Sequence, residues 1–128
     1  MIYVDTSVIL AHVLTEARRP SRELWKERLV SSRLLQYEVW ARLNRARVTA
    51  QVAESAREAL ARIAFVELSP HVLARALEPF PAPVRTLDGL HLATIDYLRS
   101  QNQPLSLVAY DERRVSAARR MKVSIGKF

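Results

Sequence analysis

Residues 2–10, IYVDTSVIL, place an aspartate directly after a short apolar run. The apolar run is predicted to form a buried strand. Residues 7–16 are predicted to form the helix that follows it, with Asp5, Thr6 or Ser7 capping the first turn. Burying an isolated carboxylate costs several kcal/mol. Asp5 is therefore expected to be paired, to cap the helix, to lie exposed at the strand end or to bind a metal.

The composition describes a small chain without cysteine. Its 128 residues are expected to form a single domain, residues 1–128. The absence of cysteine excludes disulfides and thiolate-held zinc or iron–sulfur sites, and nothing favours secretion. The apolar start is too short for a signal peptide, and no run approaches the roughly eighteen residues of a membrane span. These features predict a soluble cytoplasmic protein.

The chain is strongly basic. Its net charge is +7, from 20 Lys and Arg against 13 Asp and Glu, and most of the basic residues are arginine. The planar guanidinium group of arginine suits bidentate phosphate contacts better than the lysine ammonium does. The charge therefore favours a polyanionic partner such as RNA or DNA, although a solvated arginine-rich surface without such a partner explains it equally well.

Short apolar runs alternate with helical patterns along the chain. Strands are predicted at residues 2–4, 65–68, 105–110 and 122–126. Helices are predicted at residues 7–16, 21–30, 34–45, 50–63, 86–100 and 112–121, and a further helix begins at Pro70. Three prolines in residues 78–86 mark a loop. Strands that alternate with helices predict an α/β fold, a three-layer sandwich with a central, mainly parallel β-sheet flanked by helices.

Four acidic residues are predicted to meet at one edge of this sheet. Asp5 and Asp111 each follow an apolar strand directly, and ligands of parallel sheets bind at the carboxyl ends of the strands. Asp88 lies in the first turn of the apolar helix 86–100, and Glu38 lies among apolar neighbours. Converging carboxylates repel one another unless a cation neutralises them, and oxygen ligands without cysteine favour Mg²⁺ or Mn²⁺.

Each of these acids also has a purely structural explanation. Asp5 and Asp88 can cap helices, and Asp111 can close a turn at the end of its strand. Glu38 can form an ion pair with Arg42, four residues later on the same helix face. If no site were present, all four structural explanations would have to hold at once. The four acids together therefore favour a metal site.

Three further side chains lie near the predicted site residues in the sequence. Arg42 and Arg45 follow Glu38 at i+4 and i+7, so they share its helix face and are candidate contacts for RNA phosphates. His91 follows Asp88 at i+3, the spacing of a metal-binding pair. His91 lies in an apolar stretch, which favours a packed histidine over a metal ligand.

Apolar bulk outside the predicted sheet suggests an interface. It includes Leu24, Trp25, Trp40, Val72 and Leu73. These side chains are more than one small domain easily buries in its own core. They favour assembly with another protein surface.

Four segments of the chain resemble the PIN-domain ribonucleases, and specifically the VapC-type toxins of prokaryotic toxin–antitoxin pairs. They are IYVDTSVIL, SSRLLQYEVWARL, RTLDGLHLAT and LVAYDERRVSAARRMKV, in the order found in that family. The resemblance implies an endoribonuclease that depends on Mg²⁺ or Mn²⁺, the toxin of such a pair, acting on structured RNA such as tRNA or rRNA. It also implies a homodimer and a cognate antitoxin protein as inhibitor. A catalytically idle PIN-like module that binds RNA or protein is the alternative.

The resemblance also implies roles for individual residues. The residues that match the family's catalytic, metal-binding acids are Asp5, Glu38, Asp88 and Asp111. Ser7 matches the polar position that supports the site through its hydroxyl group. Some members carry a further acid after the fourth one, where this chain has Arg113 and Val115. This departure leaves open how tightly a second metal is held.

Overall fold

A parallel sheet of five strands organises the protein in the computed structural model, which describes residues 1–128. The strands are β1 (Ile2–Val4), β2 (Leu29–Ser32), β3 (Ile63–Val66), β4 (Ser106–Val108) and β5 (Ser124–Ile125). Their order in the sheet is β3-β2-β1-β4-β5, so β1 lies in the centre. The predicted α/β fold with a central parallel sheet is confirmed.

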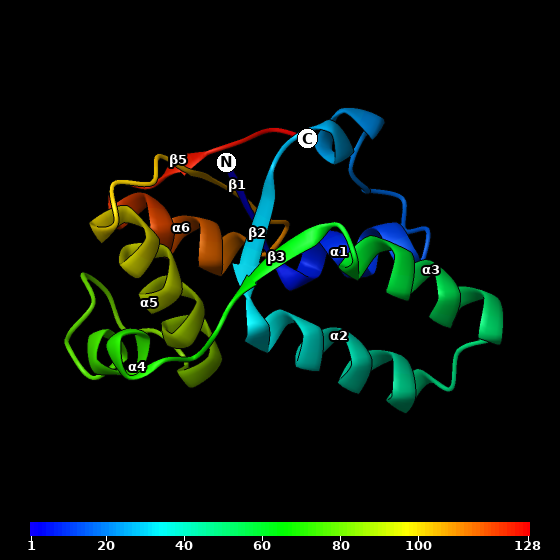
Figure 1. Ribbon diagram of the computed structural model, residues 1–128, viewed down its shortest axis with the longest axis horizontal. Coiled ribbons are helices and arrows are strands. Elements are labelled where there is room, and N and C mark those ends of the chain that lie inside the picture. The colour runs from blue at the N-terminus through cyan, green and yellow to red at the C-terminus, as the bar shows by residue number, and fades with distance from the viewer.

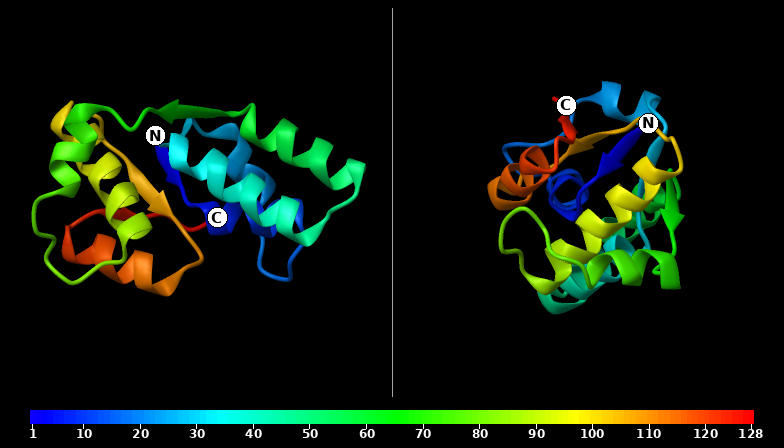
Figure 2. Two further views of the ribbon diagram at one scale, coloured as in Figure 1. Left: turned by 90° about the horizontal axis from the view of Figure 1, so that it is seen from below. Right: turned by 90° about the vertical axis from the view of Figure 1, so that its left-hand side faces the viewer.

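Helices cover both faces of this sheet (Figures 1 and 2). They are α1 (Thr6–Val13), α2 (Arg33–Ala46), α3 (Ala50–Leu60), α4 (Pro70–Ala76), α5 (Thr86–Ser100) and α6 (Glu112–Arg120), together with a short 3₁₀ helix, η1 (Arg22–Lys26). Strand side chains alternate between the two faces, as the pleat requires. Ile2 and Val4 pack with α1, α2 and α3, whereas Tyr3 and Leu107 pack with α5 and α6. This alternation gives the three layers that the sequence predicts.

Strand β2 occupies part of a segment predicted to be helical. The prediction of a helix over residues 21–30 is wrong: η1 is short, and the chain is extended from Leu29. Leu29 pairs with Ile2 in β1 and with Ile63 in β3, and all of β2 is buried. Pairing on both sides outweighs the local helical pattern. Ser32 then caps α2 by accepting a hydrogen bond from the Leu34 amide at 3.1 Å.

The carboxyl ends of β1 and β4 lie side by side. Val4 is in register with Val108, and the Asp5 amide donates a hydrogen bond to the Val108 carbonyl oxygen at 3.0 Å. Asp5 and the segment that leads to Asp111 therefore emerge at the same edge of the sheet. We call this edge the carboxyl edge.

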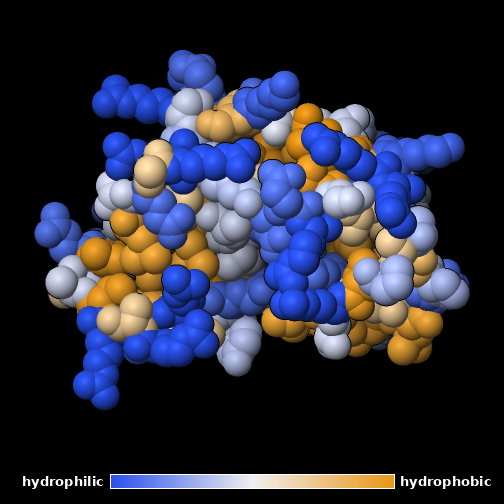
Figure 3. All heavy atoms as spheres, turned by 180° about the vertical axis from the view of Figure 1, so that it is seen from behind, coloured by the Kyte–Doolittle hydropathy of each residue, from blue (hydrophilic) through white to orange (hydrophobic).

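Most of the apolar bulk expected at an interface is packed within the monomer. Leu24 and Val72 are fully buried, so the argument for an interface from these two residues is wrong. Leu77 is the most exposed large apolar side chain, at 89%, and Leu73 and Leu87 are also exposed. On the face shown in Figure 3, long hydrophilic side chains are interspersed with apolar surface. None of the helices has both the length and the apolar character that crossing a lipid bilayer requires.

Candidate active site

Asp5 is fixed in place by the start of α1. Its side chain is almost fully buried, with 1% of the residue exposed, and it caps α1. Asp5 Oδ2 accepts hydrogen bonds from the Ser7 amide at 3.1 Å and from Ser7 Oγ at 2.5 Å. Ser7 Oγ in turn accepts a hydrogen bond from the Tyr110 amide at 2.9 Å. Ser7 thus connects the aspartate to the segment that follows β4, and only Asp5 Oδ1 remains for other partners.

Arg114 of α6 lies between Asp5 and Asp88. Its Nη1 atom donates to Asp5 Oδ1, and its Nη2 atom donates to Asp88 Oδ1. Arg114 Nε also donates to Asp88 Oδ1, at 3.1 Å. Burial alone would lower the pKa of the Arg114 guanidinium, but the charges of Asp5 and Asp88 outweigh burial and raise that pKa. A positive charge is therefore fixed between the two carboxylates.

Glu38 belongs to a second, separate network. Its Oε1 atom accepts a hydrogen bond from Thr6 Oγ1 at 3.0 Å and lies 2.5 Å from His91 Nε2. The other nitrogen of the buried His91 ring, Nδ1, lies 2.7 Å from the Tyr3 hydroxyl. Burial raises the pKa of Tyr3, so its hydroxyl stays protonated and can donate to Nδ1. With Nδ1 accepting that bond, Nε2 donates to Glu38. The expectation that His91 is a packed histidine is confirmed.

Asp111 is turned toward its own helix. It caps α6, accepting a hydrogen bond from the Arg113 amide at 3.0 Å, and its closest ion-pair partner is the Arg113 side chain at 3.7 Å. The sequence suggested that Asp111 closes a turn at the end of its strand, but in the structure it caps α6. Asp88 does not cap α5, whose first residue is preceded by Arg85 without a side-chain cap.

The four predicted ligands do not form one cluster: Arg114 joins Asp5 and Asp88, whereas Glu38 and Asp111 have other partners. No three histidine, cysteine, aspartate or glutamate side chains lie close enough to hold an ion together. Oxygen atoms of this kind suit Mg²⁺ or Mn²⁺. In this arrangement Arg114 is bonded to both Asp5 and Asp88, so a guanidinium group occupies the position between them that a divalent ion would take. The guanidinium group of Arg114 places a positive charge beside Asp5 and Asp88, where the sequence predicted a metal ion.

The sequence did not identify Arg114 as a site residue. It instead suggested Arg42 and Arg45 as the arginines beside Glu38. Arg42 and Arg45 are exposed on α2, and neither pairs with Glu38. Arg114 lies in the basic segment 112–121, where nothing in the sequence separates it from its exposed neighbours. The only available signal is its position three residues after Asp111, which places it near the end of β4.

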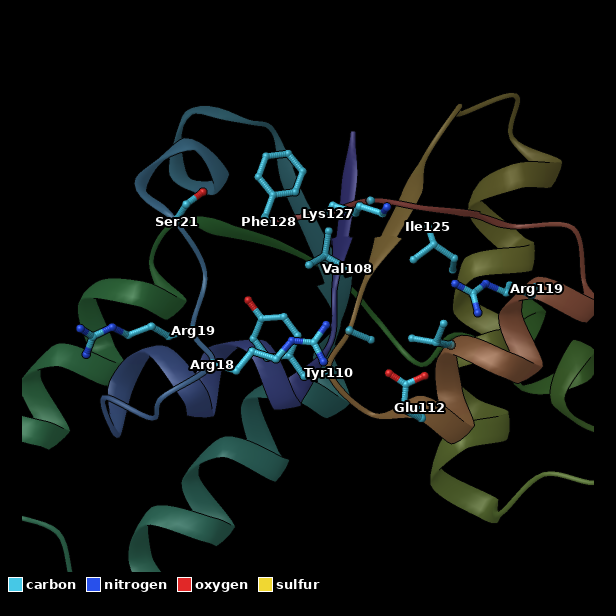
Figure 4. A pocket seen from close by; sticks show the side chains of 13 residues that line it. Arg18, Arg19, Ser21, Val108, Tyr110, Glu112, Arg119, Ile125, Lys127 and Phe128 are labelled. Atoms are coloured by element: carbon cyan, nitrogen blue, oxygen red, sulfur yellow. The ribbon is translucent and has the colours of Figure 1, made fainter.

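Two basic cavities flank the first turn of α6, and Glu112 borders both. The first, of about 770 Å³, is lined by Asp88 together with Arg85, Arg113 and Arg120; we call it the arginine groove. The second, of about 500 Å³, is shown in Figure 4 and includes Arg18, Arg19, Tyr110, Arg119 and Lys127 among its lining residues; we call it the basic cavity. The Arg18 guanidinium lies 4.3 Å from the centre of the Tyr110 ring.

Comparison with known proteins identifies the family. The family model described as PIN domain matches residues 2–120, which include all the acids discussed above and Arg114. A comparison with curated proteins found no significant match. PIN domains are generally nucleases, and they typically use divalent metal ions. By the extent of this match, which covers the strands β1 to β4 and every helix, the chain belongs to the PIN domain family of nucleases.

Proposed function

We propose that the chain is an endoribonuclease that hydrolyses RNA phosphodiester bonds at the carboxyl edge. The observation that carries the proposal is the buried Asp5 beside Asp88, at the carboxyl ends of the strands of a PIN domain. A buried carboxylate such as Asp5 costs free energy to maintain, and carboxylates in such positions are common at catalytic sites. We propose Asp5, Glu38, Asp88 and Asp111 as the catalytic acids and Mg²⁺ or Mn²⁺ as the cofactor, held by the same acids.

We further propose that the RNA strand follows the arginine groove past Asp88. The guanidinium groups of Arg85, Arg113 and Arg120 line this groove and can grip phosphates next to the bond that is cut. The basic cavity lies on the other side of the first turn of α6 and offers the Tyr110 ring, on which a base can stack. The net charge of +7 supports a polymeric anion as the substrate.

The test of this function is cleavage of RNA by wild-type protein and by variants of the acids. Wild type should cleave RNA in Mg²⁺ or Mn²⁺ and should lose this activity in a chelator. Asp5→Asn and Asp88→Asn should each lower the rate about a hundredfold or more, since even indirect supports of such sites cost ten- to a hundredfold. Circular dichroism should confirm that both variants are folded.

Asp96→Asn is the matched control for Asp88→Asn. Asp96 lies on the same helix, but it pairs with Arg75 at 2.7 Å, away from the carboxyl edge. This variant should cleave RNA at the wild-type rate. Undiminished cleavage by both Asp5→Asn and Asp88→Asn would refute the assignment of the site.

A catalytically idle module that binds RNA or protein is the second candidate function. The ion pairs that Arg114 makes with Asp5 and Asp88 support it, because two of the four proposed acids already share one guanidinium as a partner. An idle module should bind RNA with the same affinity in Mg²⁺, Mn²⁺ and chelator, and should leave it intact in all three.

We also propose that the protein is the toxin of a toxin–antitoxin pair, acts in the cytoplasm on structured RNA such as tRNA or rRNA, and is inhibited by a cognate antitoxin. Expression of wild type should slow growth, and expression of Asp5→Asn should not. A short open reading frame overlapping or just upstream of the gene would support the pairing. Wild-type expression without any effect on growth would argue against a toxin.

A homodimer is the proposed assembly, with the apolar groove between α4 and α5 as its interface. Leu73, Leu77, Phe80 and Leu90 line this groove of about 880 Å³ together with the prolines of the preceding loop. Exposed apolar surface of this kind is costly in water unless a partner covers it. Light scattering at tens of micromolar should give a dimer for wild type and a monomer for Leu77→Glu. A wild-type monomer would refute the assembly.

A further inference from the structure

Packing of α6 carries the Arg114 side chain to the carboxyl edge. Val115 and Ala118 are buried in the core that α5 and α6 share, and Arg114 lies beside them with 6% of the residue exposed. The side chain of the adjacent Arg113 is 59% exposed. Burying a guanidinium is unfavourable unless charged partners compensate it. Asp5 and Asp88 are those partners, so the position of Arg114 is determined by both helix packing and charge.

Arg114 occupies an oxygen atom that a divalent ion between Asp5 and Asp88 would need. Asp5 Oδ2 is already engaged by the Ser7 amide and hydroxyl, and its Oδ1 atom faces Arg114 Nη1. Rotation of the Asp5 carboxylate would break both bonds to Ser7 and remove the cap of α1. Asp88 Oδ1 receives two bonds from Arg114. Asp88 Oδ2 makes no hydrogen bond, so a cation that bridges the two carboxylates competes with the guanidinium for Asp5 Oδ1.

We propose that Arg114 is the resident cation of the site, and that a divalent ion binds Asp5 and Asp88 only by displacing its guanidinium group. The identity of the ion, Mg²⁺ or Mn²⁺, rests on the proposed function. The protein then folds without metal, because Arg114 holds one positive charge between the two carboxylates. Metal affinity is reduced by the free energy needed to expel Arg114, so removal of the guanidinium raises that affinity.

The principal experiment is Mn²⁺ binding, measured by isothermal titration calorimetry on the full chain. Arg114→Met keeps an unbranched apolar stem but removes the charge. It should bind Mn²⁺ about tenfold or more tightly than wild type does. The control is Arg57→Met, which removes an exposed guanidinium from α3, a helix that carries none of the proposed acids, and should change the affinity by less than about twofold. Equal or weaker Mn²⁺ binding by Arg114→Met would overturn the proposal.

A second measurement on wild type does not depend on how well the variant folds. In the metal-free protein, the bond from Arg114 Nε to Asp88 Oδ1 should protect the Nε–H group from solvent exchange, which NMR of ¹⁵N-labelled protein can follow. Titration with the diamagnetic Mg²⁺ should remove this protection as the site fills. Protection that persists while Mg²⁺ saturates Asp5 and Asp88 would overturn the proposal.

RNA cleavage separates the failure of this inference from the failure of the proposed function. Tighter Mn²⁺ binding by Arg114→Met without cleavage by any variant would support the resident cation and refute the nuclease. Wild-type cleavage in Mn²⁺, together with an Mn²⁺ affinity of Arg114→Met equal to that of wild type, would support the nuclease and refute the resident cation. Cleavage that persists in chelator and is lost in Arg114→Met would show that the guanidinium acts in place of a metal, which also overturns displacement.

Discussion

Replacing Tyr3 by phenylalanine tests the buried network behind Glu38. The Tyr3 hydroxyl accepts a hydrogen bond from the Ser32 amide at 3.2 Å and lies 2.7 Å from His91 Nδ1. Tyr3, Ser32 and His91 are all fully buried, so no water replaces the lost hydroxyl without rearrangement. An unsatisfied buried polar group costs about 1–3 kcal/mol. Tyr3→Phe leaves two such groups, the Ser32 amide and His91 Nδ1, but no longer buries the Tyr3 hydroxyl, which offsets part of the cost. The variant should therefore lower the free energy of unfolding by roughly 2–4 kcal/mol.

Urea denaturation followed by circular dichroism measures this loss directly. At about 4 °C per kcal/mol, Tyr3→Phe should also lower the melting temperature by roughly 8–16 °C. Tyr110→Phe is the control, because no hydrogen bond joins the Tyr110 hydroxyl to the rest of the protein. It should change the free energy of unfolding by less than about 0.5 kcal/mol.

A double-mutant cycle with His91→Leu completes the test. The two changes together should cost less than the sum of the single changes, by about 1–3 kcal/mol, because the double variant leaves fewer unpaired groups. Costs that add fully, or a Tyr3→Phe variant as stable as the control, would show that the network contributes nothing to folding. The reasoning about how Glu38 is held would then fail.

Two further predictions concern pH and RNA binding. Burial, followed by repulsion from nearby arginines, lowers the pKa of His12. As the pH drops through about 6.5, His12 takes up a proton more readily in the unfolded chain than in the folded protein, so the free energy of unfolding should fall. Melting curves from pH 7.5 to 5.5 should show a smaller fall in His12→Gln than in wild type. Replacing both Arg85 and Arg120 by glutamine should weaken RNA binding, measured by fluorescence anisotropy in chelator. The slope of log binding constant against log salt concentration should become shallower by about 0.7 for each phosphate contact that is lost. A larger loss from the equivalent change at Arg42 and Arg45 would place the RNA along α2.

Strand β2 shows where sequence reasoning about this fold ends. The strands β1 and β4 could be predicted because each is a run of apolar residues followed by a polar one. Residues 21–30 carry a helical pattern, and the evidence for a strand lies in β1 and β3, which pair with Leu29 and Val30 from distant parts of the chain. Local propensity is a weak guide at such a position, since burial on both faces decides the conformation.

The same limit applies to the candidate site. The positions of Asp5 and Asp111 at strand ends follow from the parallel sheet, so the carboxyl edge could be predicted from the sequence. The partner of Asp5 could not, because Arg114 is 109 residues away along the chain. Nor could the partner of Glu38, since a residue four positions later, Arg42, offered a simpler pair than His91 does. The acids were thus predictable, but what neutralises them was not.

The central place of β1 has a consequence for synthesis on the ribosome. β1 is the first strand to be made, but its neighbour β4 begins only at Ser106, and the guanidinium that compensates Asp5 comes later still. At roughly 5–20 residues per second, β1 waits several seconds with one edge unpaired. The carboxyl edge is therefore complete only when the ribosome has translated Arg114, and a nascent chain halted before that residue has no assembled site.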